Sequence, residues 1–549
     1  IYTEERYTVT LPDGVFEKMS SAASKIRSGY KALISNEKSF VRLMTFIAAA
    51  VLVYVLFIPR IGAYNNGDFG RMMKAMQLTW QPYDNLHIEE QVVEKVIENY
   101  NYIEPYDWTM IRPSKVELSQ AYISAFMRIL YEIAGIKFST AIVALLYAAV
   151  LVVCFRRFMI FGYSLLGSKA LAVGIGFILV FFGSYNMGWL NSFFGEGVSF
   201  VFLMAVIASS IDVIQRPKGK PGIALLLYFV SCVMFVGSKA QFVITIPVIA
   251  VWTIVLIVYH MPKGVRKKIV LAAATACYAF VLIRSGINIY SNNEKISSQD
   301  TLIQGLYNGI LVVADDKEAA LEELGLDTRL AADAGKNAYE DPSTYFCPPR
   351  TEMAQEMIYS KVSSVDYLIW YIKHPSKLLV MLNAAAEASH NQMPDYFLFV
   401  GDRISEGGSG KVNKLGLWKQ IRPAFVPDCF AGFLIVFAAI FVYCFVCILS
   451  RKTSSCKRMY LGLFVVFMLC GIIQYPLTVI GNGFSDNIKQ IYLFREVWDG
   501  TVLVLLTWAV VRLSGYIKAQ KEAAVSSDGS VKTRFALIEK ISKRFSKKI

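Results

Sequence analysis

The sequence predicts an all-α polytopic membrane protein, and three observations support this fold class. Of its 549 residues, 55% are hydrophobic and only 18% are charged, whereas soluble domains carry about 25% charged residues. The mean hydropathy is +0.45. The apolar residues gather in runs of roughly 16–22 residues, the length of a membrane-spanning helix, rather than in alternating ten-residue strands, which excludes an outer-membrane barrel.

About ten apolar runs can cross a bilayer, and the shorter ones must include flanking residues to reach the roughly 20 that a span requires. These runs cover residues 43–58, 140–155, 170–182, 198–214, 223–236, 242–259, 269–283, 430–449, 461–480 and 502–513. The stretch 118–136 is interrupted by Arg128 and Glu132. We therefore expect it to lie in the membrane interface as an amphipathic helix.

The distribution of basic residues predicts the sidedness of the chain. Lys and Arg (56) exceed Asp and Glu (42) by 14, and the excess falls in short loops and at the ends, as in contacts with anionic lipid head groups rather than with nucleic acid. The tail from Arg512 holds 10 basic and 3 acidic residues, whereas 287–427 holds 13 basic and 18 acidic. We expect a multi-pass cell-membrane protein with both termini cytoplasmic and its polar chemistry outside.

These assignments divide the chain into five predicted parts. They are a cytoplasmic segment 1–42, a transmembrane module 43–286 with a first outward loop 60–119, an extracytoplasmic subdomain 287–427, C-terminal transmembrane helices 428–513 and a basic cytoplasmic tail 514–549. Within the subdomain we expect helices over 301–324, 351–358 and 375–389, joined by Gly-rich connections such as 406–410.

Two acids in predicted outward turns are the first candidates for chemistry. Asp68 follows the first span in Asn66-Gly67-Asp68-Phe69-Gly70-Arg71, where Asn-Gly-Asp is also an ordinary solvated turn. A carboxylate held at the rim by a helix end can have its basicity set by its neighbours. Glu196, in Phe194-Gly195-Glu196-Gly197, presents a second acid between two spans, with an exposed loop acid as the alternative.

Basic residues at the same predicted rim are candidates for binding an anion. Lys239 and Gln241 lie at the outer end of a span, where a snorkelling lysine is the alternative interpretation. Asp486, Lys489 and Arg495 belong to the last outward loop; the first two are three residues apart and can pair on a helix. His87, His374 and His390 show no metal-ligand spacing, so no metal site is predicted.

The order of these features resembles the GT-C class of polytopic glycosyltransferases. In that class an Asp in a long first outward loop is followed by amphipathic helices, an acid in the next outward turn, a Lys at a span mouth and a late polar loop. The segments 66–71, 194–197, 238–241 and 483–489 are similar to bacterial WsfD-type hexose transferases of glycan biosynthesis. The likeness covers most of the chain by layout and is specific in these short stretches.

The resemblance implies an inverting transfer of a sugar, a hexose in the WsfD-type proteins, from a polyprenyl-phosphate carrier to a glycan or other cell-surface acceptor. It implies that Asp68 is the general base, and that Glu196 positions the acceptor or a divalent metal. Metal-binding members often carry paired acids, and neither Asp68 nor Glu196 has a second acid within two residues. We therefore expect no cofactor, with a divalent metal as the alternative.

Two other functions compete with the single-sugar transferase. A lipid-linked-sugar transporter or flippase would place ionisable residues near the membrane midplane, often in two related halves. In this sequence the spans are nearly free of charged residues, and the two halves show no similarity to each other. A polysaccharide polymerase or ligase that moves a preassembled lipid-linked glycan shares every feature above. The cations Lys239, Lys489 and Arg495 suit a departing phosphate in either enzyme.

Overall fold

The computed structural model of the protein describes residues 35–80, 95–391, 396–405, 407 and 411–526. The chain divides into two units, residues 1–499 and 500–549. All contacts considered below lie within the first unit. Of the second, the structure describes the remainder of helix α22 up to Ser526. Most of the predicted connection 406–410 lies outside the described residues.

The transmembrane helices confirm the predicted fold class. Within the described residues, eight helical stretches are long and apolar enough to cross a membrane. One of them, Thr140–Phe181, contains both α5 (Thr140–Leu166) and α6 (Ala170–Phe181). These two helices fold back on each other, since the Phe155 ring lies 5.5 Å from that of Phe177. With the shorter apolar helix α9 (Gly222–Val236) included, every predicted span lies in one of these helices, although the spans 43–58 and 170–182 each extend one residue beyond the helix end.

The remaining spans are single helices or pairs of helices joined end to end. They are α2 (Glu37–Phe57), α8 (Gly195–Gln215), the short helix η5 (Ala240–Thr245) with α10 (Ile246–Tyr259), α11 (Val265–Gly305), α18 (Phe430–Leu449), α19 (Ser455–Ile472) with α20 (Gln474–Asn482), and α22 (Tyr492–Ser526).

Helix α8 is the centre of the bundle. The protein buries 89% of its most apolar stretch, compared with 17% for α11. Its side chains contact neighbouring spans: Ser210 accepts a hydrogen bond from the Trp252 indole of α10 at 3.1 Å, and Phe202 packs against Tyr147 of α5. Because α8 is enclosed on all sides, its first residues, including Glu196, are held in a fixed position.

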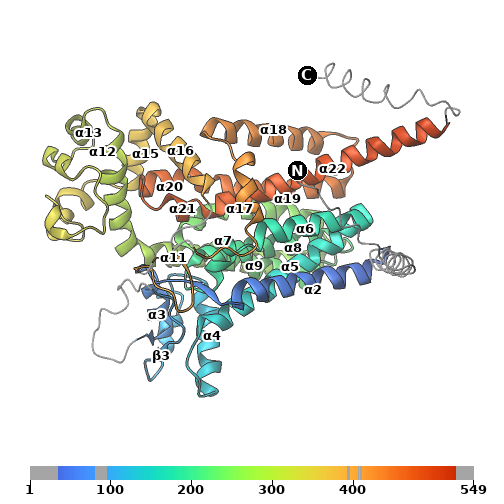
Figure 1. Ribbon diagram of the computed structural model, residues 1–549, viewed down its shortest axis with the longest axis horizontal. Coiled ribbons are helices and arrows are strands. Elements are labelled where there is room, and N and C mark those ends of the chain that lie inside the picture. The colour runs from blue at the N-terminus through green and yellow to red at the C-terminus, as the bar shows by residue number, and fades with distance from the viewer. Residues whose placement is uncertain (1–34, 81–94, 392–395, 406, 408–410, 527–549) are drawn as a thin grey trace, which may run out of the picture. The chain divides into compact units, whose positions relative to one another are not determined.

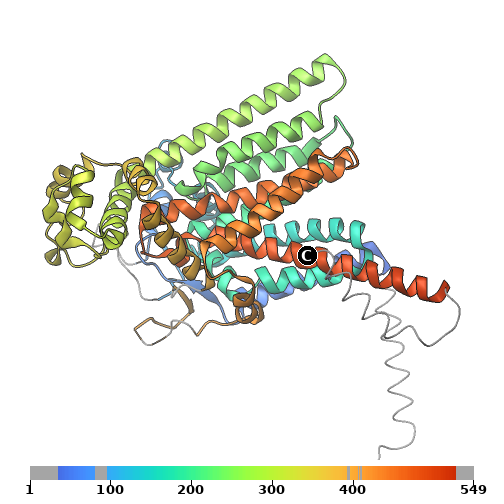
Figure 2. The ribbon, with the colours of Figure 1, turned by 90° about the horizontal axis from the view of Figure 1, so that it is seen from above.

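One end of the bundle, which we call the loop end, carries both the first loop and the segment between α11 and α18 (Figures 1 and 2). The first loop contains the short strands β1 (Ile61–Ala63), β2 (Leu78–Thr79) and β3 (Asn101–Tyr102) and helix α3 (Gly70–Met76), and helix α4 (Gln120–Ile133) follows it. Strand β1 pairs antiparallel with β4 (Phe397–Phe399), in the register Ile61 to Phe399. This ladder joins the first loop to the distant segment.

Lys414 attaches that segment to the end of α2. Its ammonium donates hydrogen bonds to the carbonyls of Tyr54 at 3.2 Å, Val55 at 2.9 Å and Pro59. Tyr54 and Val55 lie in the last turn of α2, where a cation adds hydrogen bonds to the carbonyls and complements the helix dipole. The contact sets the point where the chain leaves α2 and the first loop begins.

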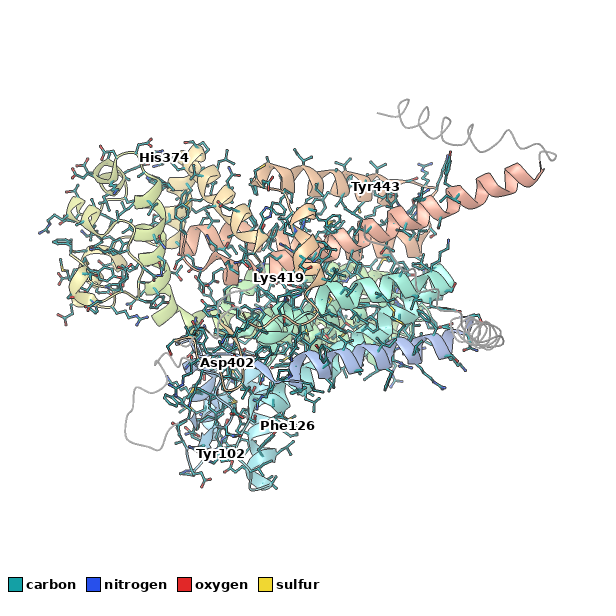
Figure 3. The ribbon with its side chains drawn as sticks, in the orientation of Figure 1. Tyr102, Phe126, His374, Asp402, Lys419 and Tyr443 are labelled. Carbon is teal, nitrogen blue, oxygen red and sulfur yellow. The ribbon has the colours of Figure 1, made fainter. Side chains whose placement is uncertain are left out.

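Helix α4 is not among the membrane-spanning helices, in agreement with the interpretation of residues 118–136. Its buried face is polar, with Gln120, Ser124 and Arg128, and its exposed face is apolar. Phe126 is 57% exposed on that face (Figure 3), next to Leu130 one turn later. A position in the membrane interface stays a prediction, and the exposed apolar stripe supports it.

The predicted helix 301–324 is wrong as a single element. Helix α11 runs on to Gly305 and continues as a π-helical turn and α12 (Leu311–Val313), and the chain then breaks before α13 (Lys317–Glu323). The break follows from Asp316, whose side chain accepts a hydrogen bond from the Ala319 amide at 3.0 Å and starts a new helix.

The other two predicted helices of the segment are confirmed, and one helix was missed. Residues 351–358 form α14 (Glu352–Ala354) and a π-helical turn, and residues 375–389 form α16 (Pro375–His390). Helix α15 (Ser364–Lys373) lies between them. A Ser363–Asp366 capping box begins it, a pattern readable from the sequence.

Candidate active site

The turn that carries Asp68 is built by the two asparagines before it. The Asn65 side-chain oxygen accepts hydrogen bonds from the amides of Gly67 at 2.9 Å and Phe69 at 3.1 Å. The Asn66 oxygen accepts one from the Asp68 amide at 3.4 Å. Gly67 has a φ of +106°, a conformation that favours glycine. This turn places the Asp68 carboxylate immediately before α3, and Asn66, predicted to bind substrate, helps to form the turn.

Asp68 is bound by two cations. Lys489, on the short helix α21 (Asn487–Gln490), forms an ion pair with one carboxylate oxygen, and Arg71 reaches the other at 3.1 Å. The Lys489 ammonium also lies 3.7 Å from Asp486, the pairing expected from their spacing, and 4.7 Å from the centre of the Phe194 ring. The chain thus brings together residues that are 421 positions apart.

A second ion pair lies beside the first. Glu196, only 2% exposed, receives a hydrogen bond from the Lys239 ammonium at 2.8 Å. Lys239 also donates to the Gln490 side chain at 2.9 Å, and Gln241 donates to the Gln490 backbone carbonyl at 3.4 Å. Because Lys489 and Gln490 are adjacent in α21, this helix links the two ion pairs into one cluster.

Gly195 allows α8 and the Lys239 segment to approach each other. A Cβ atom at this position would lie 2.3 Å from the Ser238 carbonyl oxygen, a backbone atom that cannot easily move aside. Any larger residue would therefore push apart the two backbones that carry Glu196 and Lys239. This close approach requires the glycine before the acid.

The ion pairs set the protonation states of the cluster. Burial alone would raise the pKa of Asp68, but Lys489 and Arg71 hold it well below its ordinary value. Burial alone would lower the pKa of Lys489, but Asp68, Asp486 and Glu196 raise it above its ordinary value. At neutral pH the Asp68 carboxylate is ionised and the Lys489 ammonium is charged. The site therefore holds a proton acceptor next to a fixed positive charge.

A pocket of about 680 Å³ opens beside this cluster. One wall is the Tyr64 ring from the first loop, and another is the face of α16 that carries Ala384, Glu387 and Ala388. Phe484, residues 486–488 and Tyr396 complete it. Asp486 belongs to both the pocket and the cluster, since it contacts Lys489, and burial raises its pKa.

Arg495 takes part in a different buried network. Its guanidinium donates to the Asn391 carbonyl, and the adjacent Glu496 accepts from the Asn186 side chain at 2.9 Å. Asp499 lies in the same helix as Arg495 and accepts a hydrogen bond from the Arg422 side chain at 2.7 Å. Asp68, Glu196, Arg71, Lys239, Gln241, Asp486 and Lys489 thus meet in one region, while Arg495 binds elsewhere.

The described part of the chain contains no group of three or more His, Cys, Asp or Glu side chains that could hold a metal ion. His374 contacts Glu323 at 2.7 Å and His390 contacts Asp428 at 3.3 Å. His87 lies outside the described residues. In the cluster, Asp68 and Asp486 pair with Lys489, and Glu196 pairs with Lys239.

Three residues of the site were not predicted from the sequence: Tyr396, Glu387 and Gln490. Tyr396 precedes β4, and its ring stacks near that of Phe194 at 5.8 Å. The pairing of β1 with β4 brings Tyr396 to the site, and these three-residue strands have no sequence motif that would predict it. Gln490 follows Lys489 directly, so extending the late-loop motif by one residue would have found it.

Comparisons with known proteins identify a family. The model of the family described as YfdI N-terminal transmembrane domain matches residues 17–528, most of the chain. Curated proteins and solved structures gave no match. The family is associated with glycosyltransferase-like proteins, and its transmembrane domain is compatible with a membrane enzyme that acts on glycans. The chain belongs to the YfdI N-terminal transmembrane domain family.

Proposed function

We propose that the protein is a GT-C-type membrane glycosyltransferase that moves a hexose from a polyprenyl-phosphate carrier to a glycan or similar acceptor, with inversion. One observation carries the proposal. The first-loop acid, the second-turn acid and two lysines from distant spans and loops meet in one cluster beside an open pocket. The family's association with glycosyltransferase-like proteins supports it.

The cluster supplies a base for the proton of the acceptor and positive charge for the leaving phosphate. The acceptor oxygen forms a bond to the anomeric carbon while the bond from that carbon to the phosphate oxygen breaks. Asp68 accepts the proton of the acceptor hydroxyl. Lys489 and Lys239 stabilise the charge of the leaving polyprenyl phosphate, which departs without protonation. Glu196 holds Lys239 in place through its 2.8 Å ion pair.

Donor binding also activates the base in this proposal. Without donor, Lys489 pairs with Asp68 and keeps its pKa low, so the carboxylate is a weak base. A donor phosphate competes for the same ammonium. As Lys489 turns towards the phosphate, the pKa of Asp68 rises, because its nearest counter-charge is shared with a second anion. Proton transfer is then efficient only when the donor is in place.

We further propose that the loop end faces outward, as the basic loops predict. Two exposed native cysteines test this sidedness: Cys429 precedes α18 at the loop end, and Cys456 lies in the first turn of α19, beyond the other end of α18. In single-cysteine variants, an impermeant maleimide should label Cys429 in intact cells and Cys456 only after permeabilisation. The reverse pattern would contradict the proposed sidedness.

The reaction itself is tested with purified protein and synthetic polyprenyl-phosphate hexoses. We expect hexose transfer with inverted anomeric configuration and no transfer from nucleotide sugars. Transfer only of preassembled oligosaccharides would favour the polymerase or ligase instead. Movement of the lipid-linked sugar between leaflets without a new glycosidic bond would favour the flippase.

A further inference from the structure

The pocket beside the ion-pair cluster has the size of a small-molecule site. Its volume of about 680 Å³ lies within the usual range of about 300–1,000 Å³ for ligand pockets. It shares Asp486 with the cluster, and Asp486 lies 3.7 Å from the Lys489 ammonium that binds Asp68. A molecule in the pocket is therefore placed next to the proposed base and the proposed phosphate site.

Aromatic rings form much of the pocket wall. Tyr64, Tyr396 and Phe484 come from three separate segments, and the rings of Tyr64 and Tyr396 meet edge to face at 5.5 Å. Ala384 and Ala388 are one helical turn apart on α16 and leave space in front of these rings. A flat apolar ring face next to open space suits the C–H face of a pyranose ring.

Two carboxylates complete the pocket. Glu387 is on the same face of α16 as the two alanines, and its side chain is exposed. Asp486 is held by its contact with Lys489 and by a hydrogen bond with Tyr396. Carboxylate oxygens accept hydrogen bonds from neutral hydroxyl groups and repel anions. The pocket therefore favours a neutral polyhydroxylated ligand over a uronate or a phosphate.

We propose that this pocket binds a neutral hexopyranose ring, stacked on the aromatic wall and hydrogen-bonded through its hydroxyls to Glu387 and Asp486. The inference rests on the proposed function and adds to it the binding residues and the charge of the sugar. The ring belongs either to the acceptor glycan or to the hexose of the donor. Both present the same chemistry, and kinetics separate them.

Direct binding tests the pocket without turnover. In saturation-transfer NMR with the purified full chain, the methyl α-glycosides of glucose, galactose and mannose serve as neutral probes and methyl glucuronide as the anionic one. At least one neutral glycoside should bind about tenfold or more tightly than the uronide. Glu387→Ala and Ala384→Phe should each weaken its binding about tenfold, the effect of losing a charged hydrogen bond or the space for the ring.

Matched variants control for indirect effects. Glu322→Ala removes an exposed acid from α13, and Val380→Phe adds a ring to α16 one turn before the pocket; both should bind the glycosides normally. Uronide binding equal to that of the neutral sugars, or full binding by Ala384→Phe, would overturn the proposal. Asp68→Asn should still bind them, so loss of transfer alone does not affect this test.

Steady-state kinetics identify the source of the ring. Glu387→Ala should raise the KM for one substrate: an effect on the acceptor places the acceptor sugar in the pocket, and an effect on the donor places the donor hexose there. Unchanged KM values for both would overturn the inference even if the enzyme transfers hexose. A wild-type protein that binds the glycosides but transfers no hexose would instead contradict the proposed function and leave the sugar site supported.

Discussion

Asp68→Asn is expected to retain the fold and to lose about 10²–10⁴-fold in kcat, the contribution of a positioned general base. The turn built by Asn65 and Asn66 accepts Asn at position 68 as readily as Asp. The amide that replaces the carboxylate cannot accept the acceptor's proton. The measurement is hexose transfer from a synthetic polyprenyl-phosphate hexose by purified variants with matching thermal unfolding.

Asp107→Asn is the matched control for this prediction. Asp107 lies in the same loop, where its carboxylate accepts a hydrogen bond from the Thr109 amide at 2.8 Å, a capping role that Asn can take over. Its turnover should be close to that of the wild type. Near-normal turnover of Asp68→Asn would remove the base assignment, and loss of wild-type activity with a chelator would show that a metal is required after all.

Lys489→Met is expected to raise the KM for the donor by about tenfold or more and to lower kcat, because it removes the charge nearest to the proposed phosphate site. Lys489→Arg should retain more donor affinity, since it keeps the charge. The exposed Lys361 provides a control: Lys361→Met should leave both constants unchanged. Unaltered donor KM in Lys489→Met would show that this lysine serves only as the counter-ion of Asp68.

The double variant Asp68→Asn with Lys489→Met tests whether the two residues act as a unit. If Lys489 acts on kcat partly through Asp68, the loss in kcat of the double variant should be clearly smaller than the product of the two single losses. Independent roles would instead multiply the two losses in kcat. The double variant also removes both charges of the ion pair together, so neither is left unpaired.

The sequence alone identified the spans and most of the charged residues of the cluster. Long apolar runs mark membrane helices, and a charge at the end of such a run stands out, as with Glu196 and Lys239. That these residues meet Asp68 could not be predicted, because the contact depends on how α21 packs against the start of α3. The structural role of Arg495 could not be predicted either, because a buried arginine and a ligand-binding arginine have similar flanking sequences.

Tertiary contacts explain the remaining errors. Strands β1 and β4, each three residues long, are too short to show a period-two pattern, so the Tyr396 wall of the site was not foreseen. The break before α13 depends on Asp316 acting as a helix cap within an otherwise helical pattern. Glu387 occupies an ordinary position on an amphipathic helix, and only the pocket distinguishes it.

We propose that the lysines of the cluster bind the phosphate of a polyprenyl carrier beside Asp68. An experimental structure of the protein with bound polyprenyl phosphate tests it most directly. We expect phosphate oxygens within hydrogen-bond distance of Lys489 and Lys239, with the Lys489–Asp68 pair loosened and the Asp68 carboxylate facing the sugar pocket. A phosphate bound away from both lysines, with the ion pair intact, would contradict it.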